Sequence, residues 1–172
     1  MAQGPALITS TVPRPEQPGP GQESVWDYPR PPRAEADSRR AVLRHGGVVV
    51  AATTDLVLET SHPPTFYLPR TAFGEYLRPV QKTTFCEWKG VARYVDVIVP
   101  GVAPLRDVGW WYPEPDPRYP QLRDRVAVYA GPFDEITLDG ERVVPQPGGF
   151  YGGWVTAEIV GPVKGGPGTW GW

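Results

Sequence analysis

Proline and glycine recur along the whole chain, and their distribution constrains the fold more than any other feature of the sequence. The 172 residues include 23 prolines and 20 glycines. A proline inside a helix removes a backbone hydrogen bond and clashes with the preceding turn, and an interior glycine costs about 1 kcal/mol relative to alanine. Both residues also mark turns. The chain is therefore expected to be poor in helix and rich in short strands.

Two β-rich runs on either side of a glycine pair predict a hairpin. Residues 41–45 and 48–52 are mostly apolar and are separated only by Gly46 and Gly47, which suit a two-residue turn. Residues 71–77 favour a short helical turn. Further strands are predicted where runs of β-branched, aromatic or other apolar residues lie between turn-forming residues. These runs are residues 56–59, 65–68, 82–87, 91–99, 125–129 and 135–138.

The chain is predicted to form one all-β or β-dominated domain with an extended segment at each end. Its length is that of a single domain. Residues 1–22 are rich in proline and glycine and predict an extended N-terminal arm. Residues 23–144 contain the predicted strands. Residues 145–172 form a tail rich in glycine and tryptophan, and we expect it to pack on the domain because each exposed indole leaves ~150–250 Å² of ring surface in water.

The charge and the hydropathy pattern argue against two classes of partner. The net charge of -2 and the pI near 5.7 give no overall basic surplus, so no nucleic-acid binding is predicted without a local basic patch. No stretch approaches the ~18 apolar residues of a membrane span, and the N-terminus lacks the features of a signal peptide. Cys86 is the only cysteine, so no intramolecular disulfide can form. A cytoplasmic protein that does not bind membranes is expected.

The pattern Trp-x-Tyr-Pro-x-Pro occurs twice, at residues 26–31 and 110–115. Proline restricts itself and the residue before it to extended conformations, so the Trp and Tyr two positions apart project from the same side of a stiff segment. Each copy predicts an aromatic clamp for a flat ligand. Arg30 in the first copy corresponds to Glu114 in the second.

A second constellation lies in residues 59–70, Glu-Thr-Ser-His-Pro-Pro-Thr-Phe-Tyr-Leu-Pro-Arg, and in residues 86–90, Cys-Glu-Trp-Lys-Gly. The glutamate-threonine lead, the Pro-Pro-x-Phe-Tyr-x-Pro-Arg stretch and the Cys-x-aromatic-Lys-Gly block resemble the signature of domain-of-unknown-function family 427. This bacterial family is sometimes labelled nucleotidyltransferase-like. The resemblance covers roughly residues 40–138, and the ends of the chain are similar to actinobacterial members. Glu87 stands where the family usually has proline.

The resemblance implies a β-tent-like fold, in which two antiparallel sheets lean together. Such folds often carry a zinc ion between two Cys-x-x-Cys pairs. With one cysteine, and with His45 and His62 as the only histidines, this chain cannot assemble four such ligands, so the zinc site is expected to be absent. No metal and no cofactor is predicted. The pocket between the sheets is the feature expected to remain.

The predicted function is binding of a flat, polar or anionic small molecule in that pocket. Aromatic side chains would form its walls and polar or basic ones its ends, because ligand sites combine apolar walls with a few placed polar groups. Structural roles are the alternative for these residues, as anchors for the rings and as solvated surface groups for the charges. The ten predicted ligand-binding residues are Trp26, Tyr28, Arg30, Thr60, Tyr67, Arg70, Trp88, Lys89, Trp111 and Tyr112.

Two alternative functions stay open. The first is an enzyme, either one related to the nucleotidyltransferase-like label or one that uses Cys86 with a histidine base. No catalytic residue is predicted, because a cysteine in an apolar strand is more often inert. The second is a protein-interaction module, in which the two Trp-x-Tyr-Pro-x-Pro segments form a homodimer contact through Arg30 and Glu114.

Overall fold

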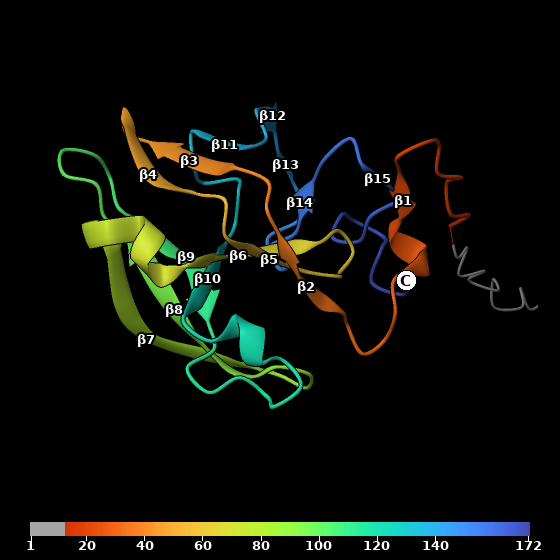
Figure 1. Ribbon diagram of the computed structural model, residues 1–172, viewed down its shortest axis with the longest axis horizontal. Helices are drawn as coiled ribbons and strands as arrows, with labels where there is room; N and C mark the ends of the chain where they lie inside the picture. Colours follow the sequence, from red (N-terminus) through yellow and green to blue (C-terminus); the bar gives the residue numbers. More distant parts are fainter. Residues whose placement is uncertain (1–12) are drawn as a thin grey trace, which may run out of the picture.

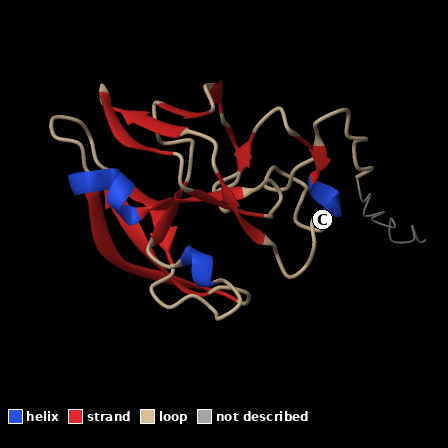
Figure 2. Cartoon of the chain, in the orientation of Figure 1, coloured by secondary structure: helices blue, strands red, loops and turns tan. Residues whose placement is uncertain are grey.

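The computed structural model describes residues 13–172 and consists mainly of antiparallel β-sheets (Figures 1 and 2). Strands account for 42% of it and helix for 8%. The helical segments are short 3-10 turns, η1 (Val25–Asp27), η2 (Arg70–Tyr76) and η3 (Pro120–Leu122). The prediction of a β-dominated fold with little helix is confirmed. No helix among the described residues is long and apolar enough to cross a membrane.

A seven-stranded antiparallel sheet forms the centre of the molecule. Strand pairing extends across the whole sheet, and β7 at one edge curves away from the four-stranded layer above (Figure 1). In spatial order its strands are β2 (Ala34–Asp37), β5 (Leu56–Glu59), β6 (Thr65–Pro69), β10 (Arg125–Val128), β9 (Leu105–Trp111), β8 (Gly90–Val97) and β7 (Leu77–Cys86).

A four-stranded sheet covers one face of this central sheet. Its β3–β4 hairpin is the predicted one, and Gly46 and Gly47 form the turn with φ of 60° and 80°, a left-handed conformation that glycine adopts without steric cost. The spatial order is β12 (Glu141–Arg142), β11 (Glu135–Leu138), β3 (Ala41–His45) and β4 (Val48–Thr53).

Two small sheets fasten the segments at the chain ends. Strand β13 (Val144–Pro145) pairs with β14 (Trp154–Val155), and β1 (Glu23–Ser24) runs parallel to β15 (Ile159–Val160). The described N-terminal residues and the C-terminal tail therefore lie side by side at one end of the molecule (Figure 1).

Two elements differ from the sequence prediction. Strand β7 begins at Leu77, five residues earlier than expected, and the second Trp-x-Tyr-Pro-x-Pro copy begins inside a strand, β9, that was not predicted. The sequence of β9 does not alternate, and Asp107 interrupts it with a φ of 49°. Tertiary packing nevertheless favours the strand. A Cβ at Gly109 would lie 2.8 Å from the carbonyl oxygen of Ala127, so glycine permits the close approach of β10.

Both faces of the central sheet are buried. The larger core lies between the two main sheets and includes Leu43, Phe66 and Ile136. The smaller one lies on the opposite face and includes Tyr67 and Tyr112, with η3 packed on it. Because β6 contributes to both cores, its sequence is apolar throughout instead of alternating.

Candidate functional site

A polar cavity of about 320 Å³ opens where the N-terminal segment, the β5–β6 loop, the β7–β8 turn and the C-terminal tail meet. Segments that are distant in sequence thus contribute to one site. The strands β5, β6 and β8 fix the positions of the loops that reach it. The lining residues that carry its chemistry are Tyr28, Arg30, Glu59, Ser61, His62, Glu87, Trp88, Gln146, Tyr151 and Lys164.

The floor of the cavity contains a buried ion pair. Glu59 is 1% exposed at the end of β5, and its Oε2 lies 3.2 Å from Nζ of Lys89. The hydroxyl of Ser61 donates to the same carboxylate, 3.0 Å from each oxygen. A buried charge is tolerated when it is paired and hydrogen-bonded. Burial alone would lower the pKa of Lys89, but Glu59 raises it above its usual value, so the ammonium group stays protonated at neutral pH.

Two tyrosines lie directly beneath this pair. The rings of Tyr67 and Tyr112 are 6.5 Å apart, and Nζ of Lys89 is 5.7 Å from the centre of the Tyr112 ring. Burial raises the pKa of both phenols, and for Tyr67 the charge of Glu59 raises it further. Both therefore remain neutral hydroxyls at physiological pH.

The mouth of the cavity is positively charged. Arg30 and Lys164 both line it, and neither has a carboxylate within 4.0 Å among residues 13–172. Burial lowers the pKa of Lys164, and the positive charge of Arg30 lowers it further. The two cations thus repel each other across the opening. An anion placed between them would relieve this repulsion.

His62 is a neutral hydrogen-bonding group in the wall. Burial, followed by the charges of Lys164 and Arg30, lowers the pKa of His62 to about 4. Its buried Nδ1 has no hydrogen-bond partner within the described part of the chain. On its other side the ring packs edge-on against Trp26, with the ring centres 5.0 Å apart. The imidazole is therefore an uncharged part of the cavity wall.

Gln146 holds the separate segments of the wall together. Its Nε2 donates to the carbonyl oxygens of His62 at 2.6 Å and Lys164 at 3.0 Å. Its Oε1 accepts from the backbone N–H of Gly153 at 3.0 Å. The side chain is buried, so these three hydrogen bonds are made out of contact with water. One amide thus links the β5–β6 loop to two parts of the tail.

A comparison with protein-family models identifies the family of this chain. The model of a domain of unknown function, DUF427, matches residues 33–139, which is more than half of the chain. The chain belongs to the DUF427 family. No curated protein matches it. In this DUF427 chain the matched region supplies the cavity floor, Glu59 and Lys89, whereas Arg30, Gln146 and Lys164 lie outside it.

The DUF427 chain brings seven of the ten sequence-predicted residues to the cavity or to its floor. Tyr28, Arg30, Thr60 and Trp88 line it. Lys89, Tyr67 and Tyr112 form the layer below. The hydroxyl of Thr60 is already engaged, since it accepts from the backbone N–H of Arg33 at 2.8 Å. Trp26 lies behind His62, and its Nε1 donates to the carbonyl oxygen of Pro162 at 2.9 Å.

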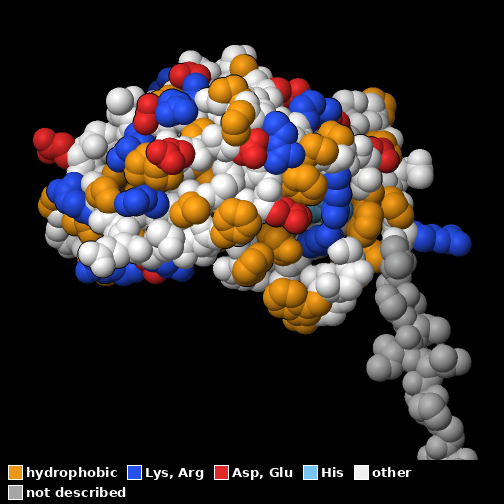
Figure 3. Space-filling model, turned by 90° about the horizontal axis from the view of Figure 1, so that it is seen from below, with side chains coloured by type: hydrophobic (Ala, Val, Ile, Leu, Met, Phe, Trp, Pro, Cys, Tyr) orange, Lys and Arg blue, Asp and Glu red, His pale blue; other side chains and the backbone are white. Residues whose placement is uncertain are grey.

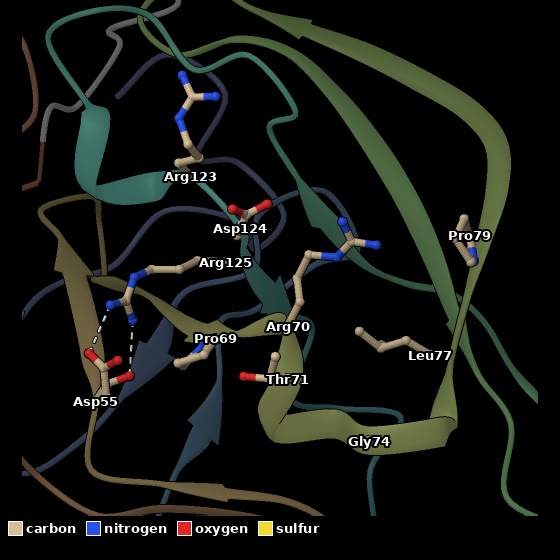
Figure 4. Close-up of a pocket in the computed structure, with 10 residues that line it drawn as sticks. All are labelled: Asp55, Pro69, Arg70, Thr71, Gly74, Leu77, Pro79, Arg123, Asp124 and Arg125. Atoms are coloured by element: carbon tan, nitrogen blue, oxygen red, sulfur yellow. Dashed lines mark hydrogen bonds and ion pairs between the residues drawn. The ribbon is translucent and has the colours of Figure 1, made fainter.

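The expectation that Arg70 and Trp111 share this cavity is wrong. Successive residues of a strand point to opposite faces, so Trp111 projects away from Trp110 and Tyr112. The guanidinium of Arg70 lies 3.9 Å from the centre of the Trp111 ring. Figure 4 shows Arg70 extending into a separate hollow of about 660 Å³, where Arg125 pairs with Asp55 at 2.8 Å. The first Trp-x-Tyr-Pro-x-Pro segment lines the cavity through Tyr28 and Arg30, whereas the second contributes no lining residue and only its Tyr112 lies in the layer below.

Seven of the ten lining residues named above were not among the predicted ligand-binding residues: Glu59, Ser61, His62, Glu87, Gln146, Tyr151 and Lys164. Glu59 could have been recognised from the sequence, because it follows directly on the apolar run Leu56-Val57-Leu58, and the strand that they form is largely buried. Gln146 and Lys164 could not, since their role depends on the fold of the tail. Among residues 13–172, no group of three or more His, Cys, Asp or Glu side chains is placed to hold a metal ion.

Proposed function

We propose that the cavity binds a flat, anionic small molecule. The observation that carries this proposal is the presence of two cations, Arg30 and Lys164, on one cavity without a carboxylate partner among the described residues. Arginine suits planar carboxylate or phosphate groups because its N–H donors form a fork, and lysine adds a point charge.

The acidic residues of the cavity do not cancel this charge. Glu59 is neutralised by Lys89 and accepts two contacts from Ser61. Glu87 is exposed in the turn between β7 and β8. His62 is uncharged at neutral pH. The charge available to a ligand is therefore that of Arg30 and Lys164, reduced by one exposed carboxylate.

A flat ligand is proposed because aromatic rings form part of the cavity wall. Tyr28 and Trp88 both line the cavity, and burial raises the pKa of Tyr28 so that its hydroxyl stays neutral. The indole of Trp88 is positioned by Arg118, whose guanidinium lies 5.7 Å from the ring centre and donates to the Trp88 carbonyl oxygen at 3.3 Å. A cavity of about 320 Å³ is at the lower end of the range for small-molecule sites, which favours a ligand of one or two rings.

A thermal-shift screen of nucleotides, nucleobases, aromatic carboxylates and imides tests this proposal, followed by calorimetric titration of each hit. Anionic planar compounds are expected to raise Tm, and neutral analogues are not. Arg30→Ala and Lys164→Ala are expected to weaken binding at least tenfold. Arg123→Ala is the matched control, because this exposed arginine lines the separate hollow. Binding that is unchanged in both cavity variants would contradict the proposal.

A further inference from the structure

An aromatic cleft adjoins the proposed ligand cavity. This cleft has a volume of about 140 Å³ and is lined by Phe150, Tyr151, Trp170 and Trp172 together with Lys164. Tyr151 and Lys164 line both the cavity and the cleft. The ammonium group that we assign to anion binding therefore belongs to a side chain shared by two aromatic compartments.

The rings of the cleft are unusually accessible. Trp170 is 81% exposed, Phe150 68% and Tyr151 43%. Large exposed rings gathered at one place are typical of interaction sites. Figure 3 shows hydrophobic side chains next to Lys and Arg atoms right of centre on the face seen from below, toward the end of the molecule where the tail lies in Figure 1. Cationic and hydrophobic groups thus meet on this face.

A series of ring contacts connects the cleft with the cavity. Phe150 and Tyr151 pack edge to face with centres 4.8 Å apart. Trp172 lies 6.1 Å from Trp26, and Trp26 lies 5.0 Å from His62 in the cavity wall. The two compartments therefore share one aromatic framework, in which Trp26, one of the predicted ligand-binding residues, stands between them.

The backbone holds the two walls of the cleft at a fixed separation. A Cβ at Gly148 would lie 2.1 Å from the carbonyl oxygen of Gly165, so the segments pass each other at backbone contact. The hydroxyl of Thr169 accepts from the N–H of Gly165 at 3.0 Å and donates to the carbonyl oxygen of Gly166 at 2.8 Å. A preformed cleft between rings favours a flat ring as its occupant, because aromatic groups stack in offset or edge-to-face arrangements.

We infer that the ligand of this protein consists of two flat ring systems joined by an anionic group, as in an aryl phosphodiester or a dinucleotide. One ring system would lie in the cavity beside Tyr28 and Trp88, and the other in the cleft against Trp170. The anionic link would lie at Lys164, between the two compartments. This inference rests on the proposed function of the cavity and adds to it the extent and the chemical class of the ligand.

Three phosphodiester probes separate the ring contributions; binding of the two aryl probes is followed by quenching of tryptophan fluorescence, and binding of dimethyl phosphate by its competition with them. Bis(4-nitrophenyl) phosphate has two rings on one monoanionic link. Methyl 4-nitrophenyl phosphate has the same charge and one ring, and dimethyl phosphate has none. Each is titrated against the full chain and three variants. We expect the two-ring probe to bind about tenfold more tightly than the one-ring probe, since stacking of one ring is worth about 1–3 kcal/mol.

Trp170→Ala is the decisive variant, because its side chain is exposed and its loss leaves no internal cavity. It is expected to remove the tenfold advantage of the second ring and to leave the one-ring probe unaffected. Phe85→Ala is the matched control, since Phe85 is 76% exposed on β7 and lines neither compartment. Lys164→Ala is expected to weaken both aryl probes.

The outcomes distinguish this inference from the proposed function. If no probe binds, both fail. If both aryl probes bind with equal affinity, or if Trp170→Ala weakens them equally, the cavity binds an anion but the cleft is not its extension. The alternative occupant of the cleft is a second copy of the chain, and light scattering tests for it. If the protein is a dimer, and if Trp170→Ala converts it to a monomer without changing probe affinity, the cleft is a dimer contact and the inference is wrong.

Discussion

The ammonium of Lys89 and the carboxylate of Glu59 form an ion pair of 3.2 Å that is almost completely removed from water, with side-chain exposures of 11% and 1%. This pair joins the β7–β8 turn to the end of β5. It also forms the floor of the cavity, so its loss is expected to lower stability and, under the proposed function, to weaken binding.

Lys89→Met is expected to lower the free energy of unfolding by about 3–5 kcal/mol, because it leaves the Glu59 charge buried without its partner. Urea denaturation at pH 7 measures the change. The double variant Glu59→Gln/Lys89→Met is expected to recover most of the loss, since both charges are then gone. A loss below about 1 kcal/mol in the single variant would show that the pair is effectively hydrated.

Stability is expected to fall as the pH is lowered from about 6.5 to about 4. His62 has a pKa of about 4 in the folded chain and an ordinary value of 6.5. Within that window the unfolded state binds a proton at His62 and the folded state does not, so acidification favours unfolding. Urea denaturation at several pH values measures the slope. In His62→Gln the contribution of His62 to the pH dependence of unfolding should vanish. If the free energy of unfolding of this variant changes with pH as steeply as that of the parent, other groups cause the effect.

Lys164→Ala is expected to raise the pKa of His62 toward 6.5, because it removes the cation that depresses this pKa most strongly after burial. Nuclear magnetic resonance titration of the His62 ring protons reports the value directly. Arg123→Ala, a loss of charge at the separate hollow, is expected to leave it unchanged. A His62 pKa that does not respond to Lys164→Ala would place the ammonium away from the cavity.

Trp154→Ala is expected to destabilise the chain by about 3–5 kcal/mol. The indole is 1% exposed, stacks on Phe66 with ring centres 5.0 Å apart and donates from Nε1 to the carbonyl oxygen of Val128 at 3.1 Å. Trp170→Ala, a tryptophan of the same tail, should change stability by no more than about 0.5 kcal/mol. Equal effects of the two substitutions, measured by thermal unfolding, would contradict the different burial of the two rings.

Gly152→Ala is expected to destabilise the tail by about 1–3 kcal/mol through overpacking. A Cβ at this position would lie 2.2 Å from the Trp110 ring, which packs 4.9 Å from Tyr129. Gly149→Ala is the control three residues away, where a Cβ would meet no atom within 4 Å. Proteolysis of the tail compares the two, and equal rates in both variants would exclude the clash.

The fold was largely predictable from local sequence, and the site only in part. The hairpin at Gly46 and Gly47, and the strands near residues 56 and 65, follow from turn residues next to apolar runs. Strand β9 could not be predicted, because its pairing depends on Gly109 packing against β10 and not on any alternation in its own sequence.

For the cavity, aromatic and basic residue types predicted part of the lining without giving its geometry. Tyr28, Arg30 and Trp88, three of the predicted ligand-binding residues, line one cavity. The sequence alone did not show that Trp111 lies on the opposite face of the sheet from Trp110 and Tyr112, because β9 was not predicted as a strand. The contact between Gln146 and His62 spans 84 residues, so only the tertiary structure reveals it.

The position of the family match along the chain has a consequence for specificity. Residues 33–139 form the floor with its Glu59–Lys89 pair, but both mouth cations, Arg30 and Lys164, belong to the flanking segments. Under the proposed function, a relative with the same central region and different flanks would present a different set of cations to its ligand. The flanks also take part in the packing of the fold, because Trp154 lies in the core and the β1–β15 pair joins the two ends of the chain to each other.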